Sequence, residues 1–233
     1  MKKLALYAAV FLVLVMATVA SARTVDDVIS RATAAMGGQS AIDAVRSLEM
    51  NMTGTYLGKA VGMEMAILKP DCKLIGMNLM GMEIVSATDG ADYWSSRSGQ
   101  VVDMPAAAKE QFGSSFNQYC GAGIADLIGN GTFTYVGTEE VNGVDADVVE
   151  GVITGSGGVS IYFDPEGLPF RILMPNDDGE LDMYITDYRD VGGMKMAYKY
   201  ESFTNGTPDM ALQITTVDVN SDLDVTTFTR PGR

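Results

Sequence analysis

Residues 48–89 alternate apolar and polar side chains, which is the pattern of half-buried antiparallel strands. Successive strand side chains point to opposite faces, so one face of three consecutive runs is apolar and the other carries polar residues such as Glu49, Asn51 and Glu64. The apolar face gathers Leu48, Met50, Met52, Met63, Met65, Ile67, Met77 and Leu79. The pattern predicts a strand meander with one methionine-rich surface.

The alternation continues along most of the chain. Short runs at 93–95 and 101–103 extend the meander, and further strands are expected at 133–136, 145–153, 159–163, 168–174, 181–188, 194–203 and 210–219. Pairs such as Asn142-Gly143 and Asn205-Gly206 mark tight hairpins between them. The count is about eleven to thirteen strands, and a sheet of that size tends to curl.

Two stretches follow a helical period instead. Thr24 is a candidate N-cap with Asp27 three residues later, and the helix that follows should stop at Gly37-Gly38; a second short turn is expected at 41–46. Inside the strand-rich region, residues 105–131 carry apolar residues at helical spacing between several glycines. We predict that this insertion is a lid, with an apolar face made by Phe112, Phe116, Ile124, Leu127 and Ile128.

The methionines admit two interpretations. Methionine is unbranched and polarizable and is frequent on surfaces that adapt to ligands, which favours a hydrophobic binding groove. Ordinary core packing, the commoner role of a buried methionine, explains the same residues. Trp94, the only tryptophan, is likewise either a wall of the groove or a core residue.

The N-terminus has the features of a secretory leader. Lys2 and Lys3 precede an apolar run, and Ala20-Ser21-Ala22 matches the small-residue pattern of a cleavage site. We therefore expect a cleaved signal peptide over 1–22 and a soluble periplasmic mature chain over 23–233, with a single domain; an uncleaved anchor helix is the alternative. The net charge of −14 makes nucleic acid an unfavourable partner.

The residue types argue against an enzyme. The chain has no histidine, which removes the commonest general base and metal ligand, and we expect neither a cofactor nor a metal. Acidic pairs such as Asp145 with Asp147 lie beside expected turns, where carboxylates are simply solvated. Cys72 and Cys120 would meet an oxidising compartment after export, and we predict that they can pair because the lid should cover the strand that Cys72 begins.

Several segments resemble the outer-membrane lipoprotein-sorting proteins of the LolA/LolB-like family. These segments are AMGG at 35–38, VRSL at 45–48, TDYRDVGGMK at 186–195 and FTRP at 228–231. The resemblance implies a mainly β fold: a curved antiparallel sheet, an unclosed half-barrel, around a helical plug. Members hold the plug helices with an arginine on an early strand, and this sequence offers Lys69 and Lys73 nearby.

The resemblance also implies a function. It predicts a periplasmic carrier that binds a lipid or lipoprotein acyl chains on its concave face and exchanges them with membrane-protein donors and acceptors. The groove would then be lined by Met50, Met52, Met63, Met65, Ile67, Met77, Leu79 and Trp94. The alternative is a periplasmic sensory or scaffold domain that uses the same sheet to bind a protein partner.

Overall fold

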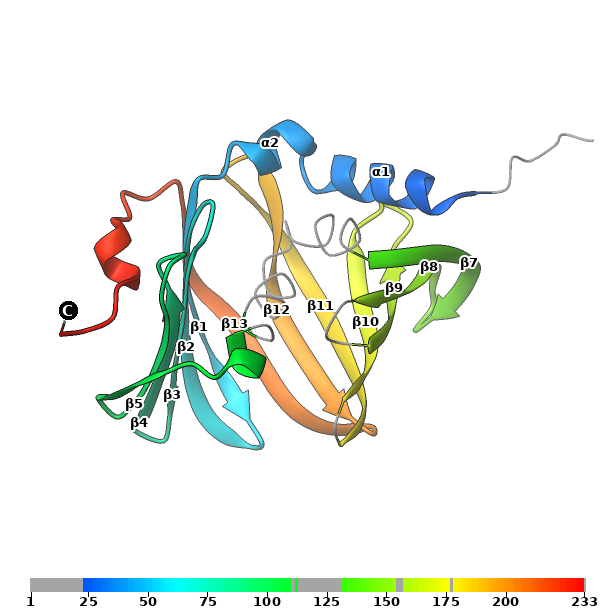
Figure 1. Ribbon diagram of the computed structural model, residues 1–233. Coiled ribbons are helices and arrows are strands. Elements are labelled where there is room, and N and C mark those ends of the chain that lie inside the picture. The colour runs from blue at the N-terminus through cyan, green and yellow to red at the C-terminus, as the bar shows by residue number, and fades with distance from the viewer. Residues whose placement is uncertain (1–22, 110–111, 113–130, 154–156, 177, 233) are drawn as a thin grey trace, which may run out of the picture.

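A computed structural model describes residues 23–109, 112, 131–153, 157–176 and 178–232. In these residues the chain forms one 13-stranded sheet with the order β6-β5-β4-β3-β2-β1-β13-β12-β11-β10-β9-β8-β7 (Figure 1). All paired neighbours are antiparallel. The two ends of the order, β6 and β7, are not paired with each other, so the described strands form an open sheet, as expected from the sequence.

The strands fall into two meanders that meet where β1 pairs with β13. The first meander is β1 (Ser47–Tyr56), β2 (Lys59–Leu68), β3 (Cys72–Leu79), β4 (Met82–Thr88), β5 (Tyr93–Arg97) and β6 (Gln100–Asp103). The second is β7 (Gly131–Val141), β8 (Val144–Ile153), β9 (Gly157–Phe163), β10 (Pro169–Asn176), β11 (Gly179–Val191), β12 (Met194–Thr204) and β13 (Thr207–Val219).

The hairpin turns follow the expected chemistry. Asn142 and Asn205 have φ angles of 53° and 49°, and each is followed by a glycine that also has positive φ. Two-residue hairpins need this left-handed backbone, which asparagine and glycine adopt at low cost. The register of the long strands is therefore fixed by local sequence as well as by burial.

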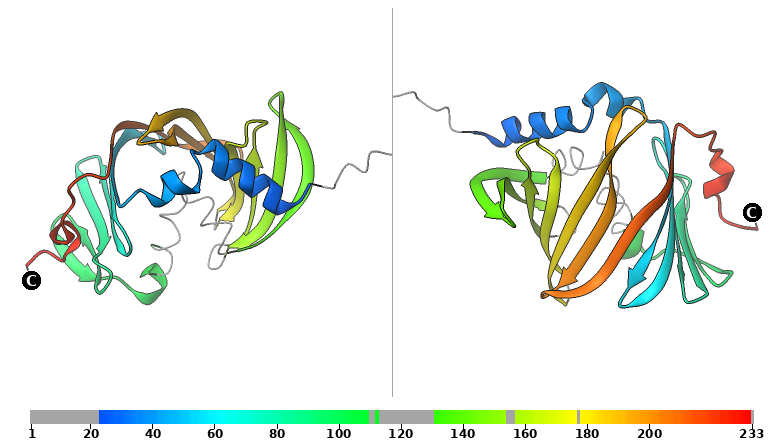
Figure 2. Two further views of the ribbon diagram at one scale, coloured as in Figure 1. Left: turned by 90° about the horizontal axis from the view of Figure 1, so that it is seen from above. Right: turned by 180° about the vertical axis from the view of Figure 1, so that it is seen from behind.

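The sheet bends around a concave face, and two helices lie across one end of it (Figures 1 and 2). Helix α1 (Val25–Ala35) begins at the predicted N-cap, because Thr24 and Asp27 form a capping box, and it buries Val28 and Ala32. Helix α2 (Gln39–Asp43) begins before the expected turn at 41–46. Its N-cap is Gly38, whose φ of 86° lets the chain pass directly from one helix into the next.

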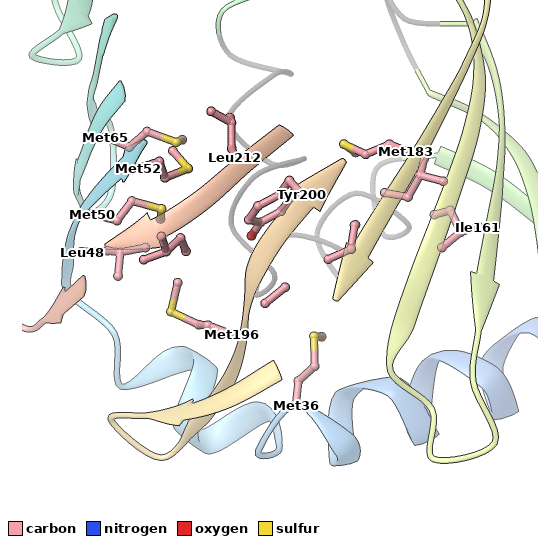
Figure 3. Close-up of a cluster of buried hydrophobic side chains, with 14 of the residues drawn as sticks. Met36, Leu48, Met50, Met52, Met65, Ile161, Met183, Met196, Tyr200 and Leu212 are labelled. Atoms are coloured by element: carbon pink, nitrogen blue, oxygen red, sulfur yellow. The ribbon is translucent and has the colours of Figure 1, made fainter. Parts of the chain in front are cut away.

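The main core fills the concave side. Figure 3 shows Met50, Met52 and Met65 pointing from β1 and β2 toward Tyr200 and Met183 of the second meander. A separate apolar cluster on the convex side contains Ala66, Cys72 and Phe228. Phe228 belongs to the 3-10 helix η1 (Val225–Phe228), which lies outside the curve of the sheet (Figure 1). The strands of the first meander thus bury apolar residues on both faces.

Candidate functional site

The methionine-rich surface lies on the concave face of β1, β2 and β3. Met50 is opposite Met65, and Met63 is opposite both Met52 and Met77, so these side chains share one face. We call this surface the methionine face: Met50, Met52, Met63, Met65, Ile67, Met77 and Leu79. Its first four members are buried, whereas Ile67, Met77 and Leu79 are partly buried and pack against them.

The facing wall comes from the second meander and was not singled out by the sequence reasoning. Ile161 of β9, Met183 and Ile185 of β11 and Tyr200 of β12 are buried in the same core. Each of these residues occupies an apolar position of an alternating strand. The signal was therefore present in the sequence, but only the closure of the two meanders through β1 and β13 shows that these positions face the methionines.

An apolar cavity of about 350 Å³ opens between β3–β5 and the segment after β6. We call it the lid cavity; it is lined by Ile75, Met77, Ile84, Ser86, Ser95, Met104, Pro105, Ala108 and Phe112. Residues 106–109 are helical, as expected for the insertion, and Phe112 is buried against the core. The other expected lid residues, Phe116, Ile124, Leu127 and Ile128, lie outside the described residues.

The prediction that Trp94 lines the groove is wrong. Trp94 is opposite Ala87, which is opposite Leu74, and this row of residues lies on the convex face. The indole Nε1 donates a buried 2.9 Å hydrogen bond to the carbonyl oxygen of Phe228. Trp94 therefore holds the C-terminal segment against the back of the sheet.

Cys72 also lies on the convex face. Its thiol is free and buried in the cluster with Ala66 and Phe228, so the predicted disulfide is not formed in this structure. Its expected partner, Cys120, lies outside the described residues. Burial raises the pKa of the Cys72 thiol, and the nearby carboxylates of Asp89 and Asp71 raise it further.

Helix α1 is fixed to the sheet by a buried carboxylate. Asp147 of β8 is 4% exposed and accepts hydrogen bonds from the guanidinium groups of Arg23 and Arg31 and, at 3.0 Å, from the Tyr135 hydroxyl. Burial raises the pKa of Asp147, but these three donors together hold it below its ordinary value. The expectation of a solvated turn residue is wrong here, because the partners come from distant parts of the chain.

Helix α2 has a contact with an early lysine. Lys69 directly follows β2, and its Nζ atom donates a 3.3 Å hydrogen bond to the carbonyl oxygen of Ile42. Lysine binds here as a single point donor, without the planar fork of arginine. Lys69 thus links the methionine-bearing strands to a helix at the end of the half-barrel.

The part of the chain that the structure describes contains no group of three or more His, Cys, Asp or Glu residues placed to hold a metal ion. It also contains no helix with the length and apolar character needed to cross a bilayer.

Three solved structures share this architecture. A DUF1329 family protein from Desulfovibrio piger superposes with a TM-score of 0.61 at 10% identity, covering 88% of this chain and 97% of its own. A domain from Vibrio parahaemolyticus named as an outer membrane lipoprotein-sorting protein gives 0.58 at 13% identity, covering 87% and 95%. A LolA superfamily protein from Nitrosomonas europaea gives 0.58 at 12%, covering 90% and 99%.

These likenesses define the class of fold. The chain is a LolA-like open half-barrel, and the resemblance noted in the sequence is confirmed at the level of the fold. At sequence identities of 10–13%, these comparisons establish a shared fold and nothing about function. No protein-family model and no curated protein sequence matches this chain.

Proposed function

We propose that this protein is a carrier that binds a hydrophobic ligand, a lipid or the acyl chains of a lipoprotein, on its concave face. The observation that carries the proposal is the lid cavity, an apolar space of about 350 Å³ within the range of small-molecule sites. Burying each methylene of an acyl chain contributes roughly 0.8 kcal/mol, so a long chain gains enough to offset its ordering costs.

The composition of the walls supports the same proposal. Met77 and Met104 line the cavity, and methionine side chains can repack around chains of different shape. Phe112 both lines the cavity and packs in the main core. In this proposal, the segment that carries Phe112 is the displaceable cover and the two methionines are the adaptable wall.

A matched pair of substitutions on β4 tests the site. Ile84 lines the lid cavity, whereas the adjacent Val85 lies opposite Gly76 on the convex face, and both are partly buried. Ile84→Asp places a charge in the apolar cavity and should weaken binding of the fluorescent methyl ester of cis-parinaric acid at least about tenfold. Val85→Asp should leave binding unchanged. Thermal melting followed by circular dichroism establishes that both variants fold.

The opposite result would exclude the site. If folded Ile84→Asp binds the ester as tightly as the wild type, the cavity is not the binding site and the methionine face is only core. If both substitutions weaken binding equally, the ligand does not distinguish the two faces of β4.

We also propose that the carrier is exported. The Lys2-Lys3 pair, the apolar run and the Ala20-Ser21-Ala22 pattern support removal of residues 1–22, and the working location is then the periplasm, between membrane-protein donors and acceptors. Intact-mass analysis of the periplasmic protein should give a chain that begins at Arg23. A membrane-bound species that retains Met1 would contradict export as a free carrier.

A further inference from the structure

Two hydroxyl groups interrupt the apolar wall of the lid cavity. Ser86 of β4 and Ser95 of β5 are directly opposite each other, and both line the cavity beside Ile84. Among the described residues neither hydroxyl has a side-chain hydrogen-bond partner. Both side chains are only partly buried, so they are reachable from the cavity. Because both hydroxyls are accessible, they can donate hydrogen bonds either to water or to a polar atom of a ligand.

An arginine lies on the same face of β5 as Ser95, at the end of the strand. Arg97 is opposite Ile84 on the same face, two residues beyond Ser95 toward the hairpin tip, or about 7 Å along the strand. Arg97 is exposed, and within the described residues it makes no ion pair. Five other arginines are paired with aspartates: Arg23, Arg31, Arg171, Arg189 and Arg230. In a chain of net charge −14, an arginine without a carboxylate partner beside a cavity is a distinctive feature.

We propose that Ser86, Ser95 and Arg97 form a head-group subsite for a single-chain anionic amphiphile. This inference rests on the proposed carrier function and names its ligand class. The guanidinium of Arg97 pairs with a carboxylate or phosphate at the mouth, since its planar fork matches both anions. The two serine hydroxyls donate to the oxygens next in line. The chain then runs past Ile84 and Ile75 toward Met104 and Phe112.

The size of the cavity decides the number of chains. At about 350 Å³ it lies near the lower end of the usual range for ligand pockets, roughly 300–1,000 Å³. One extended acyl chain fits such a space, whereas a multiply acylated anchor needs more. The backbone N–H of Met104 donates a 3.1 Å hydrogen bond to the Tyr93 carbonyl oxygen, which holds this lining residue beside β5.

The test compares the fluorescent fatty acid cis-parinaric acid with its methyl ester, which has the same chain and no charge. The wild type should bind the acid about tenfold more tightly than the ester. Arg97→Gln should remove that preference by weakening the acid alone. Arg46→Gln is the matched control, because Arg46 is also exposed but lies before β1, at the helical end of the half-barrel. It should change neither affinity.

A second pair of variants tests the hydroxyls. Ser95→Val should weaken acid and ester alike by several-fold, since the hydroxyl donates to an oxygen that both ligands possess. Ser96→Val is the control, because Ser96 is opposite Val85 on the convex face. Displacement of the probe by oleic acid or by lysophosphatidic acid then assigns the head group as carboxylate or phosphate.

The outcomes separate the two proposals. If acid and ester bind the wild type and Arg97→Gln equally, and neither anionic competitor is preferred over a neutral monoglyceride, the subsite is refuted while the carrier function stands. If neither probe binds the folded wild type, the carrier function fails and the subsite with it.

Discussion

Strands β3, β4 and β5 carry apolar side chains on both faces, and the two faces are covered in different ways. On the convex face, Phe228 is fully buried, Trp94 bonds its carbonyl oxygen, and Arg230 Nε lies 2.9 Å from an Asp92 carboxylate oxygen. On the concave face, Phe112 and the start of the segment after β6 line a cavity of about 350 Å³. Directional bonds thus hold the convex cover, whereas the concave face retains open space, and the proposed carrier function assigns ligand binding to that space.

The two phenylalanines test this difference most strongly. Phe228→Ala should lower the free energy of unfolding by about 3–5 kcal/mol, the usual cost of emptying a tightly packed site, without changing the affinity of the folded protein for methyl parinarate. Phe112→Ala should cost only about 1–2 kcal/mol, because its surroundings already contain a cavity, and it should raise that affinity.

Denaturant unfolding and probe titration measure both quantities on the same samples. Equal destabilisation by the two substitutions, with unchanged affinity for Phe112→Ala, would mean that the two covers are alike. The distinction between a structural and an exchangeable face would then be lost.

Helix α1 covers one end of the concave face, and ion pairs of Arg23 and Arg31 with Asp147 hold it there. Asp147→Asn should lower the free energy of unfolding by about 2 kcal/mol, because two arginines and a tyrosine lose a charged acceptor. The pKa of Asp147 is lower in the folded protein than in the unfolded chain, so its stabilisation is complete above the ordinary aspartate pKa of about 4. It is lost as the pH falls through the lower folded-state value.

A pH series of unfolding experiments checks the sign. The difference between wild type and Asp147→Asn should be constant at neutral pH and shrink only below about pH 4. A difference that instead shrank as the pH rose above neutrality would contradict the assigned role of Asp147.

The smallest expected effect concerns the hydrogen bond from the Trp94 indole to the Phe228 carbonyl oxygen. Trp94→Phe removes the donor to the Phe228 carbonyl oxygen and should cost about 1 kcal/mol of stability, with no effect on ligand affinity. Melting temperature and probe titration report the two results. If Trp94→Phe weakened probe binding without lowering the melting temperature, Trp94 would be a ligand contact and its placement on the convex face would be wrong.

The fold was predictable to the extent that it depends on local pattern. The two-residue period at Met50, Met52, Met63 and Met65 is a direct consequence of strand geometry, and the Asn-Gly pairs fix the hairpins. The capping box at Thr24 is equally local. The number of strands, their antiparallel pairing and the position of the first helix followed from such signals.

The face on which a side chain lies was less predictable where the strand is short. In the run from Tyr93 to Ser95, alternation separates Trp94 from its neighbours but does not say which side is concave. The decisive partner is Phe228, 134 positions away in the chain. Asp147 was misjudged for the same reason, because Arg31 lies 116 positions before it.

The central claim is that a ligand enters beside the methionine face under Phe112, and methyl NMR of methionine-labelled protein tests it most directly. Met77 and Met104 line the lid cavity, whereas Met80 is 71% exposed at a hairpin tip and Met36 is buried beside the helices. Substitution of single methionines by leucine assigns their signals. On addition of cis-parinaric acid, the account predicts saturable shifts of the Met77 and Met104 methyl signals and little change at Met80 and Met36. Saturable shifts at Met80 or Met36 with Met77 and Met104 unmoved would contradict it.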